Sequence, residues 1–334
     1  MQSYGVYVLK RFAQFLLVVF IGISLTFFIT HLSPIDPVEQ MIAGMTAMGQ
    51  SDPESVAMMR QALRELYGTG GPLMEQYVTY WRRILSLDFG PSLSAFPTPV
   101  SVLIGRALPW TVGLLLTCTL VAWTLGNLLG GLAGYYRDNR TLKALGVVVM
   151  GFHPVPYYII AFVLLIIFGL MWPILPTSGG AAANIPRGWN ADYVLSVLRH
   201  SILPAASIIL VGLGGWFMGM RALVSNVVTE DYVTYAELGG VKRSRILPFY
   251  VMRNALMPQI TGLAMTLGAI FNGAIIVEFV FSYPGLGRLL ISAVYAGDYG
   301  LVLGVTAISI VAVSAAVFLL DILYPVFDPR VQLT

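Results

Sequence analysis

The stretch ALPWTVGLLLTCTLVAWTLGNLLGGLAGYY, residues 107–136, contains no Asp, Glu, Lys or Arg. A helix that crosses the hydrocarbon core of a bilayer needs about 20 apolar residues, and this stretch is longer than that. Because lipid offers the backbone no hydrogen-bond partners, a spanning segment of this kind is predicted to be helical. The chain is therefore interpreted first as an integral membrane protein.

Other apolar runs repeat this pattern along the 334 residues. We expect an all-α membrane protein with six transmembrane helices: Phe12–Thr30, Ala107–Tyr136, Ala144–Trp172, Ser201–Met220, Asn254–Val277 and Tyr299–Leu320. Only 10% of the residues are charged, against about 25% in a soluble domain, so the lipid bilayer is the expected surroundings. The net charge of +3 gives no indication of nucleic-acid binding.

Lysine and arginine concentrate in alternate connections between the runs, which the positive-inside rule assigns to the cytoplasm. These residues are Lys10, Arg11, Arg137, Arg140, Lys143, Lys242, Arg243 and Arg245. We therefore expect a multi-pass protein with both termini cytoplasmic. Its parts would be an N-terminus with the first helix at 1–31, an external helical segment at 32–100 and a core domain at 101–334.

The external segment has helical signals of its own. Ser51-Asp52-Pro53-Glu54 predicts a helix start, and a second helix is predicted from Pro72 through Leu85. Tyr77, Trp81 and Ile84 lie on related faces of that second helix. We expect them to pack at the mouth of the membrane region, with contact to a partner protein as the alternative.

Glycines recur at four-residue spacing in the second apolar run, at Gly126, Gly130 and Gly134. Gly215 and Gly219 repeat the spacing in the fourth run. Small residues at this spacing let two helices approach closely in a membrane. Tight static packing is the favoured interpretation, and a sliding interface is the alternative.

The connection before the fifth run reads EDYVTYAELGGVKRSRILP over residues 230–248. Thr229 or Asp231 is predicted to cap a short helix over Tyr232–Leu238, which Gly239-Gly240 would end. Ser244 is predicted to start a second short helix. Such a compact knob can transmit a partner's movement to the helices on either side, whereas an ordinary surface loop rarely contains this much helix.

Residues 230–258 resemble the cytoplasmic loop of permeases from binding-protein-dependent ABC importers of the dipeptide/oligopeptide class. The matching positions in this loop are Glu230, Asp231, Tyr232, Ala236, Gly240, Arg253, Asn254, Ala255, Leu256, Met257 and Pro258. Further matches in order along the chain are Asp36-Pro37, residues 88–92, residues 278–288, Asp298-Tyr299, residues 321–324 and Asp328-Pro329-Arg330. The chain departs from the family at Leu238-Gly239, where the family often has Ala-Lys or Ala-Arg.

The resemblance implies the type I permease fold of ABC importers, with a coupling helix in the loop 226–257 that docks on an ATPase. The residues assigned to ATPase coupling are Glu230, Asp231, Tyr232, Tyr235, Ala236, Glu237, Gly239, Gly240, Arg253 and Asn254. The implied partners are a homologous second permease subunit, two ATP-binding subunits and an external solute-binding protein. The implied location is a bacterial or archaeal plasma (inner) membrane.

ATP and Mg are expected on the partner subunits, and this chain is expected to be neither an enzyme nor a cofactor-binding protein. A phosphate-binding loop needs Gly-Lys followed by Ser or Thr, but Lys10, Lys143 and Lys242 follow Leu, Leu and Val. The solute is expected to be a peptide or an oligosaccharide. Residues 258–262 and 281–285 give a weak indication of the oligosaccharide carriers.

Four residues in or near the membrane are candidates for a pore or gate: His153, Asn272, Glu278 and Tyr283. His153 lies in Gly151-Phe152-His153-Pro154-Val155-Pro156, which predicts a kinked or broken helix. It contacts either solute or a neighbouring helix. Glu278 either lines a gate or pairs with Arg288. The histidines show no metal-ligand spacing.

Two other classes of function are weighed against the importer. An ion-coupled secondary transporter would show buried charged relays and inverted repeats, and neither is evident. A membrane-embedded hydrolase would show a motif such as His-Glu-x-x-His or Gly-x-Ser-x-Gly, and neither occurs in the sequence.

Overall fold

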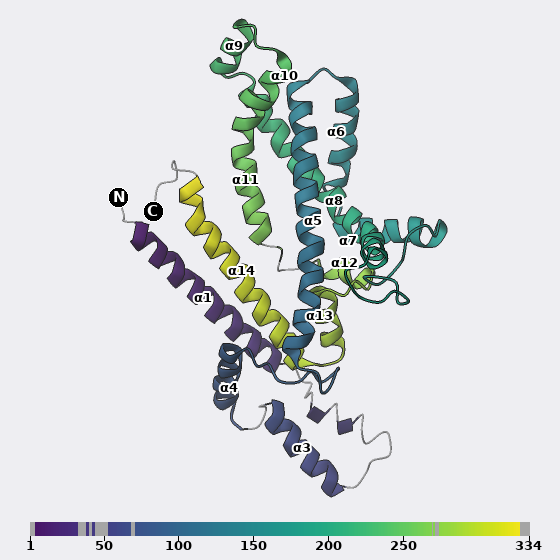
Figure 1. Cartoon of the computed structure of the whole chain (residues 1–334). Helices are drawn as coiled ribbons and strands as arrows, with labels where there is room; N and C mark the ends of the chain where they lie inside the picture. Colours follow the sequence, from purple (N-terminus) through teal and green to yellow (C-terminus); the bar gives the residue numbers. More distant parts are fainter. Residues whose placement is uncertain are drawn as a thin grey trace. The chain divides into compact units, whose positions relative to one another are not determined.

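The structure is a computed structural model, and it describes residues 4–32, 38–39, 42–43, 53–67, 71–268, 270 and 274–327, with side chains to 322 (Figure 1). These residues are almost entirely helical, with one isolated β-bridge between Pro91 and Pro99. Several predicted features lie outside the described residues: Asp36-Pro37, Ser51-Asp52, Asn272 and Asp328-Pro329-Arg330.

Four of the described helices are long and apolar enough to cross a membrane. They are α1 (Tyr4–His31), α5 (Val100–Tyr135), α8 (Ala191–Val227) and α14 (Tyr299–Phe327). A fifth candidate span is a bent pair, in which α6 (Arg140–Phe152) meets α7 (Tyr157–Leu164) and its π-helical extension η1 (Leu165–Met171) at 101°. The bend falls at residues 153–156, where the two prolines remove backbone donors, as the sequence predicts.

The predicted span Asn254–Val277 is not one continuous helix. Its described residues are divided between α11 (Arg253–Gly268), with 16 residues, and α12 (Ile275–Val280). Gly268 and Gly273 lower the helix propensity where the break falls. The described residues therefore contain four single spans and one bent pair, and the six-helix count stays a prediction.

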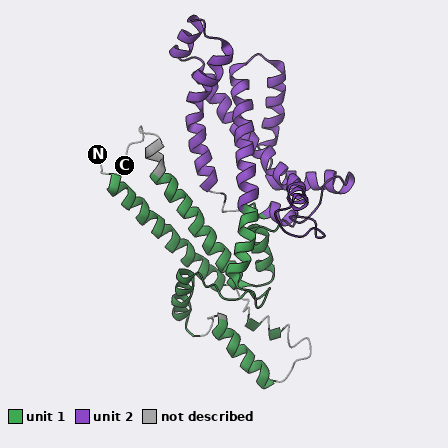
Figure 2. Ribbon diagram, viewed as in Figure 1, with its two compact units in different colours: residues 1–111, 271–275, 284–334 green, residues 112–270, 276–283 purple. Residues whose placement is uncertain are grey.

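The chain divides into two compact units (Figure 2). Unit 1 comprises residues 1–111, 271–275 and 284–334, and unit 2 comprises residues 112–270 and 276–283. In unit 1, α1 packs along α14, and the hydroxyl of Tyr7 donates to the carbonyl of Asp321 at 2.9 Å. Arg11 lies 3.4 Å from the Asp321 carboxylate. The first turns of α1 and the last turns of α14 therefore lie at the same end of unit 1.

Two helices lie in the segment that the sequence predicts to be external: α3 (Pro53–Tyr67), which starts at the predicted proline, and α4 (Leu73–Ser86). The aromatic face of α4 packs on α1: Tyr80 stacks on Phe27 at 5.3 Å and Trp81 on Phe20 at 5.5 Å. The hydroxyls of Tyr77 and Ser24 are 2.6 Å apart. The expectation that this face packs against the membrane region is confirmed.

A buried carboxylate organises the loop between α4 and α5. Asp298 is fully buried between α13 (Leu286–Tyr295) and α14. Its Oδ2 accepts from the amide and hydroxyl of Ser94, at 3.0 and 2.9 Å, and from the hydroxyl of Ser92. Its Oδ1 accepts from the amide of Leu301 at 3.0 Å, which caps the start of α14. One side chain thus caps α14 and fixes a loop some 200 residues earlier in the chain.

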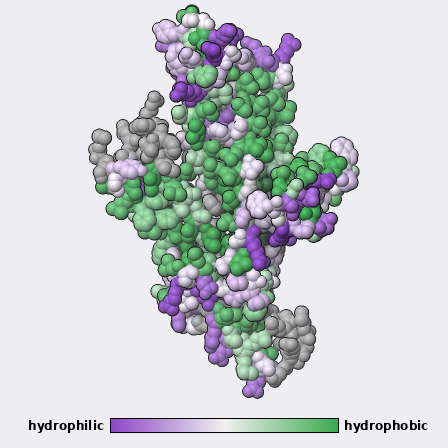
Figure 3. All heavy atoms as spheres, in the orientation of Figure 1, coloured by the Kyte–Doolittle hydropathy of each residue, from purple (hydrophilic) through white to green (hydrophobic). Residues whose placement is uncertain are grey.

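In unit 2 the glycine stripe of α5 lies against α8. A Cβ on Gly126 would lie 2.5 Å from the Cβ of Trp216, and one on Gly134 would lie 2.9 Å from the carbonyl oxygen of Arg221. A Cβ on Gly130 would clash with the carbonyl oxygen of Phe217. The predicted close approach is confirmed. In Figure 3 the surface over the long helices of unit 2 is hydrophobic, and hydrophilic residues gather near its α9–α10 end.

We predict that Gly130→Ala lowers the free energy of unfolding by about 1–3 kcal/mol, because the added methyl forces α5 and α8 apart. Gly113→Ala in the same helix is the control, because a Cβ there meets nothing within 4 Å. The measurement is the temperature at which a maleimide labels Cys118 in detergent. Cys118 is the only cysteine and is buried, with its Sγ 3.9 Å from the carbonyl oxygen of Ala205 in α8. Equal labelling temperatures for the two variants would contradict the packing described.

Candidate functional site

The predicted coupling residues lie at one end of unit 2, where α8 ends and α11 begins (Figure 1). Here α9 (Asp231–Leu238) is followed by α10 (Arg243–Ile246), which continues through the π-helical η2 (Leu247–Met252) into α11. Lys242, Arg243 and Arg245 are all exposed beside α9. The site is thus a short helix, a glycine turn and a second helical segment, as the sequence predicts.

A Schellman motif ends α9. Gly240 adopts the left-handed conformation, with φ of 74°. Its amide donates to the carbonyl of Glu237 at 3.0 Å, and the amide of Val241 donates to the carbonyl of Ala236 at 3.1 Å. These two bonds satisfy carbonyls that the end of the helix would leave unpaired. The prediction that Gly239-Gly240 ends the helix is confirmed, and Gly240 is the residue whose left-handed conformation favours glycine.

The predicted starts of both short helices are wrong in detail. The residue at the N-cap of α9 is Glu230, and its side chain makes no capping hydrogen bond. The hydroxyl of Thr229 donates instead to the carbonyl of Asn226 at 2.7 Å, so it serves the end of α8. Asp231 lies in the first turn of α9, where its charge interacts favourably with the helix dipole. The second segment begins at Arg243, one residue before the predicted Ser244.

Only two side chains of α9 are buried, Val233 and Ala236. Val233 belongs to an apolar cluster that joins α9 to α8, α10, η2 and α11. The other buried members of the cluster are Met220, Val224, Ile246, Leu247, Val251 and Ala255. The opposite face of α9 is open, with Tyr235 72% and Leu238 80% exposed. A short helix is thus fixed from beneath while its outer face presents apolar groups.

A side-chain hydrogen bond joins α9 to α11. The amide nitrogen of Asn254 donates to the hydroxyl of Tyr232 at 2.8 Å and to the carbonyl of Tyr250 at 2.9 Å. The structure therefore brings two of the predicted coupling residues together. The remaining polar members of the set are exposed at the same end: Glu230, Asp231, Glu237 and Arg253.

Below this end, α11 and α8 interlock. Gln259 of α11 packs on Gly219, where a Cβ would lie 2.7 Å from its amide nitrogen. Trp216 of α8 packs on Gly262 of α11, where a Cβ would lie 3.2 Å from the indole ring. The indole of Trp123 in α5 donates to the carbonyl of Gln259 at 3.1 Å. The sequence does not indicate a mechanical role for Gln259, Gly262 or Trp123. Their contacts pair residues of different helices, and no local sequence pattern shows such pairs.

The candidate pore residues have different surroundings. His153 lies on Gly215, and its Nδ1 is 3.4 Å from the carbonyl oxygen of Val211, so it contacts the neighbouring helix α8. Glu278 is fully buried, and its backbone carbonyl accepts a hydrogen bond from the amide of Tyr283 at 2.7 Å. The hydroxyl of Tyr283 lies 3.0 Å from that of Ser201, a contact that the sequence did not indicate. Asn272 lies outside the described residues.

No group of three His, Cys, Asp or Glu side chains that is suited to hold a metal ion occurs among the described residues. The site has instead the features of a contact surface: exposed apolar groups, flanking charges and a fixed backbone. What it can do is bind another macromolecule and pass a displacement to α8, α11 and α5.

Comparison with known proteins gives a family and several relatives. Residues 126–333 match the family described as binding-protein-dependent transport system inner membrane component. The chain is 28% identical to the oligopeptide transport system permease protein AppB of Bacillus subtilis, over 94% of this chain and 95% of that protein. It is 31% identical to a putative peptide transport system permease protein of Brucella abortus, over 97% and 98%. It is 29% identical to the oligopeptide transport system permease protein OppB of Haemophilus influenzae, over 98% and 99%.

We predict that Gly240→Val raises the hydrogen-exchange rate of the α9 amides about tenfold, because a left-handed conformation costs an L-residue about 1–2 kcal/mol. Gly240→Asn is the matched control, since asparagine tolerates this conformation and a Cβ at 240 meets nothing within 4 Å. Exchange is measured by mass spectrometry on the detergent-solubilised protein. Exchange rates equal to those of the parent in both variants would show that the turn does not hold the end of α9.

Proposed function

Because this chain belongs to the family of binding-protein-dependent transport system inner membrane components, we propose that it carries peptides across the membrane by alternating access. The chain is the multi-pass transmembrane permease subunit of an ABC importer, and it is not an enzyme. ATP hydrolysis in such systems belongs to separate subunits. Family membership favours the importer over the two alternatives, a secondary transporter and a hydrolase.

The proposed solute is a peptide, and the support comes from the relatives. AppB and OppB are named as oligopeptide permeases, and DppB of the same Bacillus is named as a dipeptide permease. Each aligns with this chain over nearly its whole length. The oligosaccharide alternative rests only on residues 258–262 and 281–285, so we place peptides first.

The outer face of α9 is proposed to dock on an ATP-binding subunit, and one observation carries this proposal. Tyr235 and Leu238 are exposed on a short helix whose backbone is fixed by Val233, Ala236 and the turn at Gly240. Exposed aromatic and aliphatic groups on a rigid support are typical of the centre of a protein interface. Glu230, Asp231, Glu237 and Arg253 would form its polar rim.

The contacts of α9 supply a route for the movement. A displacement of α9 reaches α11 through the Tyr232–Asn254 hydrogen bond. It reaches α8 and α5 through the packing of Gln259 on Gly219 and through the bond from Trp123. Because tightly packed helices move together, nucleotide-driven motion at α9 would move all three helices.

The complete transporter is proposed to contain a homologous second permease subunit, two ATP-binding subunits that bind ATP and Mg, and an external solute-binding protein. We place the chain in a bacterial or archaeal inner membrane with both termini cytoplasmic. The packing of the first turns of α1 on the last turns of α14 supports a common side for the two termini.

We predict that the double variant Tyr235→Ala, Leu238→Ala loses at least tenfold in ATP-driven uptake of a labelled oligopeptide, because it removes the apolar centre of the proposed interface. Both side chains are exposed, so membrane insertion should not change. Thr234→Ala, at another exposed position of α9, is the control. Uptake and co-purification of the ATP-binding subunit are measured in the native host.

Parental uptake and co-purification in the double variant would contradict docking through α9. A parent transporter that hydrolyses ATP but takes up no dipeptide or oligopeptide would contradict the peptide assignment alone. The two parts of the proposal are therefore tested separately.

A further inference from the structure

The apolar arc of α4 is wider than the surface that α1 covers. Tyr77, Tyr80 and Ile84 belong to the core of unit 1, which includes Ile23 and Phe27 of α1. An adjoining strip of α4 consists of Met74, Val78 and Leu85, three or more residues apart on one helical face. Met74 is 70% and Leu85 80% exposed. A contiguous exposed apolar strip of this kind marks a contact surface.

The strip continues an exposed apolar surface of α1. Trp81 lies at its edge and stacks on Phe20 of α1 at 5.5 Å. Phe20 is itself 53% exposed on a helix long and apolar enough to cross the membrane. Tyr77 stacks on Phe28, another exposed residue of α1, at 5.5 Å. The exposed apolar side of α1 is thus continuous, through stacked aromatic rings, with the strip of α4.

Both ends of α4 are tied to the ends of spanning helices. Near its start, the side-chain oxygen of Gln76 lies 3.1 Å from the Nε2 of His31, the last residue of α1. Just after its end, the ring of Phe89 packs at 3.3 Å from a Cβ position on Gly304, in the second turn of α14. Both ends of α4 therefore lie close to the end of a helix that is long and apolar enough to cross the membrane. Tryptophan and tyrosine are enriched at the membrane–water interface.

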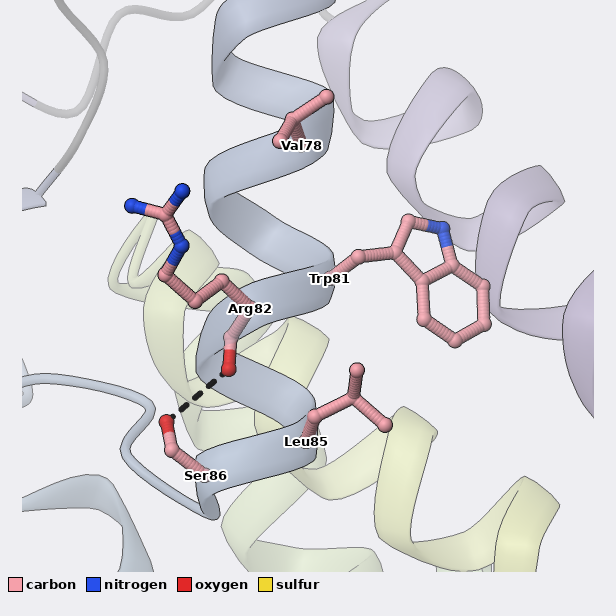
Figure 4. Close-up of a pocket in the computed structure, with 5 residues that line it drawn as sticks. All are labelled: Val78, Trp81, Arg82, Leu85 and Ser86. Carbon is pink, nitrogen blue, oxygen red and sulfur yellow. Dashed lines mark hydrogen bonds between the residues drawn. The ribbon is translucent and has the colours of Figure 1, made fainter.

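A free cation borders the strip. Val78, Trp81, Arg82, Leu85 and Ser86 line a shallow groove of about 510 Å³ (Figure 4). In Figure 4 the indole of Trp81 points toward α1, while the Arg82 guanidinium extends from the other edge of the helix. The Arg82 side chain is exposed, and its guanidinium makes no hydrogen bond or ion pair to any residue that the structure describes; the backbone carbonyl of Arg82 accepts from the hydroxyl of Ser86 at 3.0 Å. An arginine beside an apolar groove has the chemistry to bind a phosphate while its stem lies on acyl chains.

We propose that α4 is an interfacial helix and that the strip with Arg82 is a phospholipid-binding surface. The acyl chains lie against Met74, Val78 and Leu85, and the headgroup phosphate accepts hydrogen bonds from Arg82. The lipid belongs to the leaflet at the C-terminal end of α1, which is the outer leaflet in the proposed orientation. Phospholipid is the occupant because the strip is continuous with the exposed apolar side of a helix that is long enough to cross the membrane, and a cation lies at the polar edge of the strip.

Spin labelling tests which phase the strip faces. In a Cys118→Ala background, nitroxides are attached to Leu85→Cys on the strip and, as the control, to Thr79→Cys, about 120° around α4 from Leu85 and outside the strip. Collision rates with oxygen, which concentrates in lipid, and with a water-soluble nickel chelate are measured in proteoliposomes and in native membrane vesicles. The expected result is a severalfold higher oxygen-to-nickel ratio at 85 than at 79 in both preparations.

Three outcomes would overturn the proposal. Equal ratios at 85 and 79, with ready access of nickel to both, would place the strip in water. A label at 85 that is accessible to neither reagent in both preparations would mean that the chain itself covers the strip. Loss of oxygen access only in the native vesicles would identify a protein partner as the occupant.

The phosphate contact has a separate test in nanodiscs of phosphatidylglycerol. Native mass spectrometry counts the phospholipids that stay bound after release. Arg82→Gln is expected to reduce the bound fraction about fivefold. Arg187→Gln, at an exposed position of unit 2, is the control and should retain the parental fraction. A bound-lipid fraction of Arg82→Gln equal to that of the parent protein would show that Arg82 does not bind the headgroup phosphate.

Discussion

The approach of α5 to α8 is the constraint on which unit 2 depends. Lipid does not drive helices together as water does, so helices in a membrane associate through close packing and interhelical hydrogen bonds. At Gly126, Gly130 and Gly134 the backbone of α5 comes within contact distance of α8, and any side chain would separate them. Trp216 lies at the centre of this arrangement, because its Cβ packs on Gly126 and its ring on Gly262 of α11.

This packing provides a rigid support for the end of unit 2 that contains α9. The helix α9 is short, and a helix of eight residues has little stability of its own. It is held by Val233, by the bond from Asn254 and by the glycine turn, and these contacts lead to α8 and α11. We therefore propose a mechanical function, in which binding at the exposed face of α9 displaces α8 and α11.

The sequence predicted those features that local chemistry determines. The long apolar runs, the break at Pro154 and Pro156, the glycine stripe and the glycine end of α9 all follow from the preferences of single residues or short spacings. The resemblance added the family, the coupling loop and the class of partner. The boundaries 1–31, 32–100 and 101–334 and the roles assigned to the coupling and pore residues stay predictions.

Other features depend on residues far apart in the chain. The bonds of Asp298 to Ser92 and Ser94 and the contact of Tyr283 with Ser201 join separate segments, and no local pattern encodes them. The predicted cap of α9 by Thr229 is wrong because the Thr229 hydroxyl donates to a carbonyl of α8 instead. A local pattern does not decide which of two adjacent helices such a hydroxyl serves. Hydropathy predicts one helix for the fifth apolar run, because it does not include the low helix propensity of glycine.

Site-specific photo-crosslinking tests the central claim most directly. A benzoylphenylalanine in place of Tyr235 reacts with whatever lies on the outer face of α9 in the native membrane, and mass spectrometry identifies the product. The account predicts a crosslink to an ATP-binding subunit whose yield changes when ATP is bound. Crosslinks only to lipid or to this chain itself would contradict the claim that α9 couples the permease to ATP.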